Sequence, residues 1–381
     1  MVYEIMPMVW MLRLMLMLPL TVLPNGNFRF RWLSVPVALS FATWLVLVVI
    51  TYYTVRFRLD PVSVDGKHFH VWDLVPKYAS SFSLCYIVFM PYTNWALTSR
   101  AIDMIEDLKR VQVMIAALHG ATRLPRVRAL AWAACAVSVG VPVLMQATAF
   151  SALPDQAVWM TPVLLHSAAY VTLGTSFWYI ACRTVSILAH NVAADMVDDC
   201  QRLGVAGLRQ HRRIWLGLVK VVYGLSESWG RTQAVLLGAF FVTIVSISFL
   251  LTHMVFTNSL NKAGLWLFFT VVLVFLATIS TCSAAQTMTD AVRVPAKMQL
   301  LLLSFLVRDE ETTTEIVQFL EEMYLEHPKV SVCRLGVLSK ASIVYIFALA
   351  NTYIVVLSQF TLSIETSTTN FDVDPGRLKQ S

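Results

Sequence analysis

Seven long apolar stretches alternate with polar and charged segments along the chain. A helix needs about 20 mostly apolar residues to cross about 30 Å of hydrocarbon, and each stretch is long enough to do so. The stretches are Trp32–Thr54, Tyr78–Leu97, Ala129–Phe150, Trp159–Leu188, Thr232–Val255, Leu265–Ser283 and Ala341–Phe360. The pattern predicts an all-α membrane protein with seven transmembrane helices.

An eighth candidate, Ile5–Leu23, is rich in Met and Leu but is interrupted by Pro7, Arg13 and Pro19. A proline removes a helical hydrogen bond, and a charge within a span is costly in lipid. Arg13 lies inside the apolar part, whereas a signal peptide carries its basic residues before that part. We therefore interpret this segment as an amphipathic helix at the inner membrane surface.

The composition excludes a soluble protein. Of the 381 residues, 57% are hydrophobic and 14% are charged, whereas soluble domains carry about 25% charged residues. The net charge is +6, which in a soluble protein would suggest a nucleic-acid partner. Here the Lys and Arg residues are spread through the segments between spans, so we expect the lipid bilayer and no nucleic acid as a partner.

The distribution of Lys and Arg predicts the orientation in the membrane. Twenty of these residues lie on the side of the N-terminus and seven on the other side, and positively charged loops stay in the cytoplasm. We therefore expect a cytoplasmic N-terminus, an extracellular C-terminus and a multi-pass position in the plasma membrane. This orientation is the reverse of a metabotropic seven-helix receptor, which is kept as an alternative. A secondary transporter is disfavoured because the spans show no paired broken helices.

The segments predicted on the cytoplasmic side carry helical patterns of their own. Apolar residues recur at helical spacing over Ala101–Leu118, and Thr312 with Glu315 forms a capping-box pattern before another apolar stripe. Such stripes need a partner, which can be a neighbouring subunit, the same subunit or the membrane surface, and the sequence does not separate these three. The predicted division is a cytoplasmic N-terminal segment at 1–31, transmembrane helices at 32–188, a cytoplasmic extension at 189–231, transmembrane helices at 232–283, cytoplasmic anchor helices at 284–340, the last span at 341–360 and an extracellular tail at 361–381.

The last span carries a stripe with polar residues. Val356, Thr352 and Tyr345 precede Gln359 by three, seven and fourteen residues, which places all four on one helix face. An amide facing lipid would lack a hydrogen-bond partner. The stripe suits either a water-filled path closed by a narrow apolar ring or a contact with neighbouring helices, and the spacing alone favours neither.

The end of this span reads TYIVVLSQF at 352–360, which resembles the insect gustatory receptor signature TYhhhhhQF, where h is a hydrophobic residue. The matching positions of the family motif are Thr352, Tyr353, Gln359 and Phe360. Ser358 is a mild departure from the pattern. The seven spans, the N-terminal orientation and the long inner loops extend the resemblance over nearly the whole chain as architecture.

The resemblance implies a tastant-gated, non-selective cation channel of four subunits, identical or mixed, with the last span lining one pore. The family's gate lies three positions before the motif Gln, here Val356, and Gln359 is its polar neighbour in the pore. Receptors for most sugars in this family tend to have Glu directly after the motif Tyr, where this chain has Ile354. The expected ligands are therefore bitter or other plant-derived compounds, with fructose-type sugars as the alternative.

The same resemblance places a ligand pocket in each subunit among the outer halves of the second to sixth spans. Aromatic walls with a few polar groups suit small amphipathic ligands. The candidate ligand-binding residues there are Tyr86, Gln146, His166, Tyr170, Ser246, Phe249, Trp266 and Phe269. Each of them, taken singly, could instead serve helix packing.

No sequence pattern indicates an enzyme, a cofactor or a metal site. The chain lacks GxxxxGK, HExxH and GxSxG. The six cysteines show no zinc-site spacing and are interpreted as small buried hydrophobes. Asp195, Asp198 and Asp199 are interpreted as a solvated helix face. The tail after Phe360 is polar, which predicts disorder.

Overall fold

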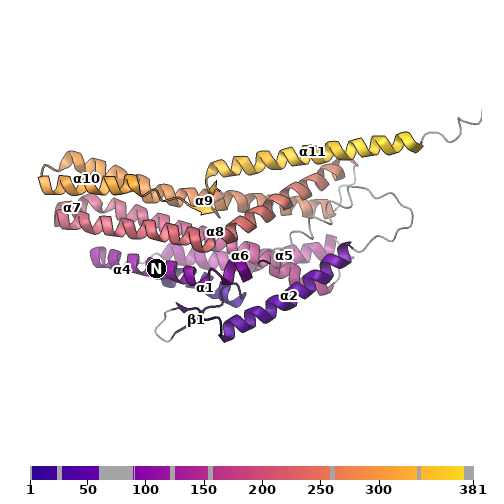
Figure 1. The fold of residues 1–381 in the computed structure, drawn as a ribbon, viewed down its shortest axis with the longest axis horizontal. Coiled ribbons are helices and arrows are strands. Elements are labelled where there is room, and N and C mark those ends of the chain that lie inside the picture. Colours follow the sequence, from indigo (N-terminus) through magenta and orange to yellow (C-terminus); the bar gives the residue numbers. More distant parts are fainter. Residues whose placement is uncertain are drawn as a thin grey trace, which may run out of the picture.

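The protein is an elongated bundle of long helices (Figure 1). The computed structural model describes residues 2–23, 28–59, 89, 91–120, 125–152, 158–257, 262–332 and 336–372. The helices are α1 (Val2–Leu14), α2 (Val35–Leu59), α4 (Thr98–His119), α5 (Pro125–Ala152), α6 (Thr161–Ala194), α7 (Met196–Leu203), α8 (Val205–Phe256), α9 (Lys262–Leu306), α10 (Glu310–Leu325) and α11 (Lys340–Asp372), with short helical turns η1 (Pro91–Trp95) and η2 (Val158–Met160). Two short antiparallel hairpins pair β1 (Thr21–Val22) with β2 (Phe28–Arg29) and β3 (Ser331–Val332) with β4 (Gly336–Val337).

Five of the described helices are long and apolar enough to cross a membrane, namely α2, α5, α8, α9 and α11. They cover the predicted first, third, fifth, sixth and seventh spans. The fourth predicted span lies in α6, which the other helices enclose. Most of the second predicted span lies outside the described residues, and its end forms η1. The helices α8 and α9 continue well beyond their apolar spans.

The helix α6 lies at the centre of the bundle, in contact with α5, α8 and α9. Trp178 is fully buried, and its indole Nε1 donates to the carbonyl oxygen of Thr281 on α9 at 3.1 Å. Phe177 packs on Trp229 of α8, with ring centroids 4.6 Å apart. These aromatic side chains bury large apolar areas. They therefore hold α8 and α9 against α6.

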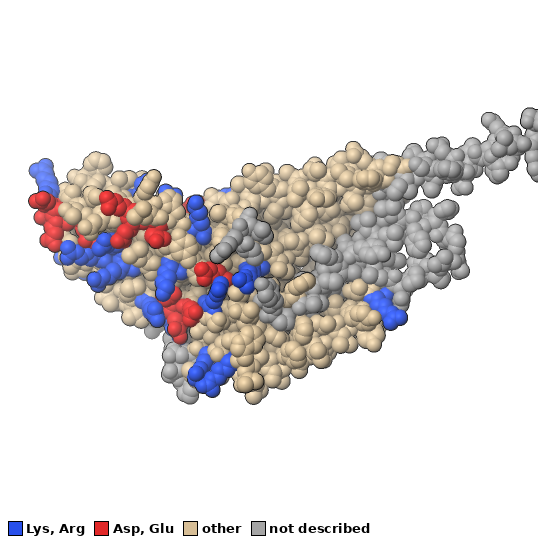
Figure 2. All heavy atoms as spheres, in the orientation of Figure 1, with Lys and Arg blue, Asp and Glu red and all other residues tan. Residues whose placement is uncertain are grey.

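Charged side chains gather over the end of the molecule where α7 and α10 lie (Figures 1 and 2). We call this part the charged end. Ion pairs connect its helices: Lys220 Nζ on α8 lies 3.0 Å from Asp107 Oδ1 on α4. The predicted helix at 101–118 is confirmed as α4, whose apolar stripe is buried. Its partner is α8 of the same subunit.

The helix α10 is present as predicted, but its predicted capping box is wrong. Asp309 precedes the helix, and its Oδ2 accepts hydrogen bonds from the backbone N–H of Thr312 at 3.0 Å and from the Thr312 hydroxyl at 2.9 Å. These hydrogen bonds favour the carboxylate and lower the pKa of Asp309. Glu315 does not reach back to the helix start because it pairs with Arg209 and Arg212 of α8.

The prediction of a membrane-surface helix near the N-terminus is also wrong. The helix α1 packs on α5 and α6, and its residues Met8 and Leu12 are fully buried. Cys135 Sγ of α5 lies 3.3 Å from Met8 Sδ. Because α1 is apolar around most of its circumference, it loses more contact with water by entering the bundle than by lying flat on a surface.

The predictions for the cysteines and for three neighbouring aspartates have different outcomes. The four described cysteines, Cys135, Cys182, Cys200 and Cys282, are free and buried, as predicted. The interpretation of three aspartates as a solvated face is wrong for Asp199, whose side chain is 2% exposed. Asp195 and Asp198 are exposed. Asp199 is covered because histidines from two other helices contact it.

The hairpin β3–β4 connects α10 to α11 and lies on α8. Ser226 Oγ donates to the carbonyl oxygen of Ser331 at 2.9 Å. A Cβ at Gly230 would lie 2.9 Å from the same oxygen, so only glycine lets the hairpin backbone approach α8 this closely. Just after the hairpin, the backbone N–H of Lys340 donates to Gln286 Oε1 on α9 at 2.7 Å. These contacts fix where α11 begins.

Candidate pore face and ligand site

The helix α11 carries the TYIVVLSQF motif and continues past the predicted end of the span. The prediction that disorder follows Phe360 is wrong for residues 361–372, which are helical. No Gly or Pro occurs between Lys340 and Asp372, so no helix breaker stops α11 there. At 1.5 Å per residue its 33 residues extend about 50 Å, more than the hydrocarbon thickness. Residues 373–381 of the predicted tail lie outside the described part.

One face of α11 packs on its own subunit. Ala350 is buried against Ile244 and Val245 of α8, together with Phe347, Ile354 and Leu357. Phe347 also stacks on Phe275 of α9, with ring centroids 3.8 Å apart. The motif residue Tyr353 meets Phe241 of α8 edge-on at 5.8 Å. This face is apolar and fixes the rotation of α11 about its axis.

The predicted stripe lies on the opposite face and is uncovered. Tyr345 is 75% and Val356 38% exposed, and Thr352 and Gln359 are exposed as well. Gln359 follows the buried Ala350 by nine residues, about 2.5 turns at 3.6 residues per turn, so it points away from α8 and α9. Thr352 Oγ1 donates to the carbonyl oxygen of Ala348 at 2.9 Å, which satisfies that hydroxyl within the helix.

Three of the predicted ligand-binding residues come from facing helices near the end of the bundle opposite the charged end. Thr172 Oγ1 on α6 donates to the carbonyl oxygen of Ser138 on α5 at 3.1 Å and fixes the antiparallel register. From this contact Gln146 lies about 12 Å along α5, and His166 about 9 Å along α6 in the same direction. Trp266 of α9 joins them, because its Nε1 donates to the carbonyl oxygen of Met145 at 3.4 Å.

Gln146 and His166 each have a polar side-chain atom without a hydrogen-bond partner in this part of the bundle. Gln146 Nε2 and His166 Nε2 are both buried, and neither has a hydrogen-bond partner among the described residues. Leaving such a group unpaired costs about 1–3 kcal/mol. A small molecule with a polar group between α5, α6 and α9 would remove this cost.

The other predicted ligand-binding residues have different surroundings. Phe249 is fully buried and Ser246 nearly so, with the Ser246 hydroxyl donating to Val242 of its own helix at 2.7 Å. Phe269 is 57% exposed on α9. Tyr86 lies outside the described residues.

Tyr170 belongs to a polar cluster that the sequence interpretation missed. Its hydroxyl and the Thr232 hydroxyl each donate to Asn94 Oδ1 at 3.1 Å. Asn94 lies in η1 at the end of the second predicted span and is 3% exposed. An asparagine inside an apolar span is itself a signal of a buried polar contact, and it could have identified this cluster.

Residues 7–364 match the family model described as 7tm chemosensory receptor. The chain belongs to this family. The membership confirms the resemblance seen in the last span. It also makes the receptor a multi-pass membrane protein whose family consists of receptors and not of enzymes.

Two proteins of Anopheles gambiae are similar to the receptor. Gustatory and odorant receptor 24 is 24% identical over 369 residues, which cover 94% of this chain and 78% of the relative. Gustatory and odorant receptor 22 is 22% identical over 248 residues, which cover 63% of this chain and 52% of the relative.

A solved structure confirms the predicted insect chemoreceptor fold. The insect olfactory receptor OR5 from Machilis hrabei, in complex with eugenol, superposes with a TM-score of 0.52 at 8% identity. The match covers 93% of this chain and 97% of that chain. At this identity the likeness concerns the fold alone.

Proposed function

We propose that the receptor is a tastant-gated, non-selective cation channel in which four subunits, identical or mixed, arrange their α11 helices around one pore. The uncovered stripe on α11 carries this proposal. Within its own chain, 6% of the most apolar window of α11 is buried, against 22–33% for the other candidate spans. Transfer of an unpaired amide to hydrocarbon costs roughly 4–8 kcal/mol. In four copies around an axis, Gln359 faces a water-filled pore. The apolar flanks of α11 then pack against the neighbouring subunits.

In this arrangement the stripe residues have separate roles. Val356 forms an apolar ring that closes the pore by excluding water, and Gln359 forms a polar ring one turn further along. Thr352 and Tyr345 line the path on the other side of the gate. Cations enter because neutral oxygens replace part of their hydration shell and no fixed positive charge lies on the stripe.

The proposed ligand site lies between α5, α6 and α9, at Gln146, His166 and Trp266. Two unsatisfied polar atoms on α5 and α6, with an indole of α9 that bonds to the backbone of Met145, suit a small amphipathic molecule. Bitter or other plant-derived compounds are the proposed class. OR5, which shares the fold, was solved with eugenol, an aromatic molecule with one polar end. Tyr86, Tyr170, Ser246, Phe249 and Phe269 remain candidates for the wall of the pocket.

The proposed topology puts the charged end in the cytoplasm. Residues 1–31, 189–231 and 284–340 then lie inside the cell, where ion pairs hold α4, α8 and α10 together. Residues 32–188 and 232–283 supply the other transmembrane helices, residues 341–360 line the pore, and the rest of the chain after Phe360 lies outside. Most Lys and Arg residues are thereby on the inner side.

Currents through substituted channels test the pore assignment. The receptor is expressed in oocytes and recorded under voltage clamp, with the wild type beside Val356→Ala and Gln359→Glu. We expect the first substitution to raise the current without ligand and the second to raise the permeability ratio of calcium to sodium. Ser358→Ala is the control, because Ser358 lies two residues further along, about 160° around the helix from Val356, and its hydroxyl donates to the Ile354 carbonyl oxygen of the same helix. Equal effects of Ser358→Ala and Val356→Ala, or none at all, would refute the pore face.

Ligand potency tests the pocket separately. Cells expressing the receptor are screened with bitter compounds and fructose by calcium imaging. His166→Ala and Trp266→Phe are expected to raise the half-maximal concentration at least tenfold without changing surface expression. His190→Ala is the control, since His190 lies on the same helix near its other end and bonds to the Ser186 carbonyl oxygen of that helix. Unchanged potency in both variants would move the pocket elsewhere and leave the pore assignment intact.

A further inference from the structure

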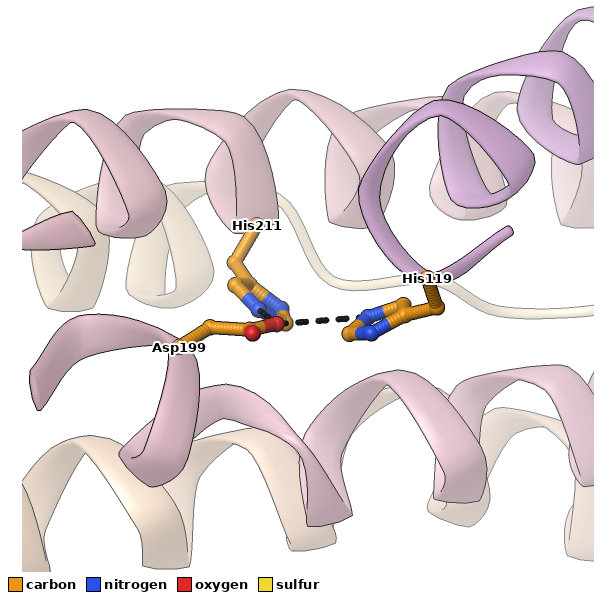
Figure 3. A group of neighbouring side chains, drawn as sticks. All are labelled: His119, Asp199 and His211. Carbon is orange, nitrogen blue, oxygen red and sulfur yellow. Dashed lines mark hydrogen bonds and ion pairs between the residues drawn. The ribbon is translucent and has the colours of Figure 1, made fainter. Parts of the chain in front are cut away.

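Two histidines and an aspartate from separate helices meet at the charged end (Figure 3). His119 is the last residue of α4, Asp199 lies on α7 and His211 on α8. Asp199 Oδ2 is 3.0 Å from His211 Nε2 and 3.3 Å from His119 Nε2. The side chains of His211 and Asp199 are almost fully buried, and that of His119 is 18% exposed. The cluster belongs neither to the proposed pore nor to the proposed ligand site.

Hydrogen bonding explains only part of the cluster. The contact between His211 and Asp199 is a hydrogen bond. His119 Nε2 is buried and close to the same carboxylate oxygen, yet it makes no hydrogen bond with any described residue. A buried ring nitrogen without a partner is unfavourable. An additional group between the three side chains would account for the approach of His119.

The geometry points to a zinc site formed by His119, Asp199 and His211. Zinc binds His nitrogen and carboxylate oxygen at about 2.0–2.2 Å in a tetrahedral arrangement, so two of its ligand atoms lie about 3.3–3.6 Å apart. The separations of 3.0 and 3.3 Å are close to this distance, and all three ligand atoms lie within 4.8 Å of one another. Imidazole and carboxylate are ligands that Zn²⁺ accepts.

The charges around the cluster also suit a divalent cation. Asp195 Oδ2 lies 3.8 Å from His119 Nε2, so a second carboxylate lies beside the cluster. His119 ends α4, where the helix dipole favours a cation. A bound ion would tie α4 to the junction of α6, α7 and α8.

Metal content tests the site on the full-length receptor in detergent. The protein is purified with an affinity tag that contains no histidine, stripped with EDTA, incubated with ZnCl₂ and passed through a desalting column. We expect mass spectrometry of the metal to find one zinc per chain in the wild type and less than one tenth of that in His119→Gln. His190→Gln is the matched control and is expected to keep its zinc, because His190 lies outside the cluster.

Cobalt spectroscopy gives a second readout that needs no variant. Co²⁺ in place of zinc is expected to show the visible absorption of a tetrahedral site, and X-ray absorption at the zinc edge is expected to show imidazole scattering from two ligands. If His119→Gln is aggregated and does not elute from size-exclusion chromatography as a single peak, these spectra of the wild type alone test the zinc site. No metal retained by the wild type, or equal zinc in His119→Gln and His190→Gln, would show that the cluster is only hydrogen-bonded.

Discussion

Glu315 is the residue through which the attachment of α10 to α8 can be measured. Its side chain is 4% exposed, with Oε2 3.2 Å from Arg209 Nε and Oε1 2.9 Å from Arg212 Nε. Glu311 lies on the same helix with its side chain 66% exposed, and its Oε1 lies 3.1 Å from Arg209 Nη2. Glu315→Gln and Glu311→Gln therefore remove one negative charge each, from a buried and an exposed position of the same network.

The structure sets the size of the expected effect. Removing one partner of a buried ion pair costs about 3–5 kcal/mol when the other charge stays buried. Here Arg209 is half exposed, and Arg212 keeps Glu322 at 3.2 Å, so neither guanidinium is left without water or a partner. What Glu315→Gln loses is the charge in one hydrogen bond, from Arg209 Nε, and in one ion pair, with Arg212, and we expect a cost of about 2 kcal/mol. The exposed Glu311→Gln is expected to cost about 0.5 kcal/mol.

Hydrogen exchange of α10 measures this difference locally, which is preferable because a multi-helix membrane protein need not unfold in two states. At a tenfold change per 1.4 kcal/mol, amides of Glu310–Leu325 should exchange about thirtyfold faster in Glu315→Gln and about twofold faster in Glu311→Gln. Peptides from α5 serve as the internal reference. Equal exchange of α10 in the two variants would mean that the buried position of Glu315 contributes nothing and that apolar contacts alone hold the helix.

Three further substitutions follow from single contacts. Gly230→Ala is expected to lower the melting temperature in detergent by the equivalent of about 1–3 kcal/mol, because its Cβ would collide with the Ser331 carbonyl oxygen; Gly238→Ala on the same helix has open space and should not lower it. Asp309→Ala should speed exchange in the first turn of α10 at pH 7. Because the pKa of Asp309 is lowered in the fold, its contribution is complete above the unfolded-state pKa and is lost as the pH falls through the folded one, so the wild type and Asp309→Ala should converge in acid. Gln286→Ala should shift ligand sensitivity without changing single-channel conductance, since Gln286 holds the start of α11 and lies off the stripe; a changed conductance would contradict this.

Local patterns predicted most helices but not their long-range contacts. The apolar spacing over 101–118 predicted α4 because a helix shows its buried face as a repeat in the sequence. The capping-box prediction was wrong because two possible cap patterns overlap in this segment. One pairs Asp309 with Thr312, and the other pairs Thr312 with Glu315. The choice between them depends on two arginines about 100 residues earlier in the chain, which bind Glu315. No local rule contains that information.

The same limit applies to the candidate sites. The stripe on α11 was predicted because all four residues lie on one helix, so its spacing is visible in the sequence. The contact of Asp199 with His119 and His211 joins three helices, and from the sequence alone Asp199 reads as one of three acidic residues close together. In the polar cluster at Asn94, the two partners Tyr170 and Thr232 likewise lie 76 and 138 positions later in the sequence. Sites made on one element are predictable, whereas sites made between elements require the fold.

The helix α9 links the proposed ligand site to the proposed pore. At one end Trp266 bonds to α5 beside Gln146, and twenty residues later Gln286 accepts the first N–H of α11. Twenty helical residues extend about 30 Å, and Trp178 holds this length at Thr281. A ligand can shift a gate only if it binds the open and closed states with different affinity. A ligand that binds between Trp266 and α5 would move this end of α9 away from α5. If α9 moves as one body about Thr281, the start of α11 must move with it, so this ligand would bind the open and closed states with different affinity. Phe275 stacks on Phe347 and lies on the Trp266 side of Thr281, so we expect it to move the middle of α11 in the direction opposite to the start of α11. The two opposed displacements would tilt the proposed pore stripe at Val356.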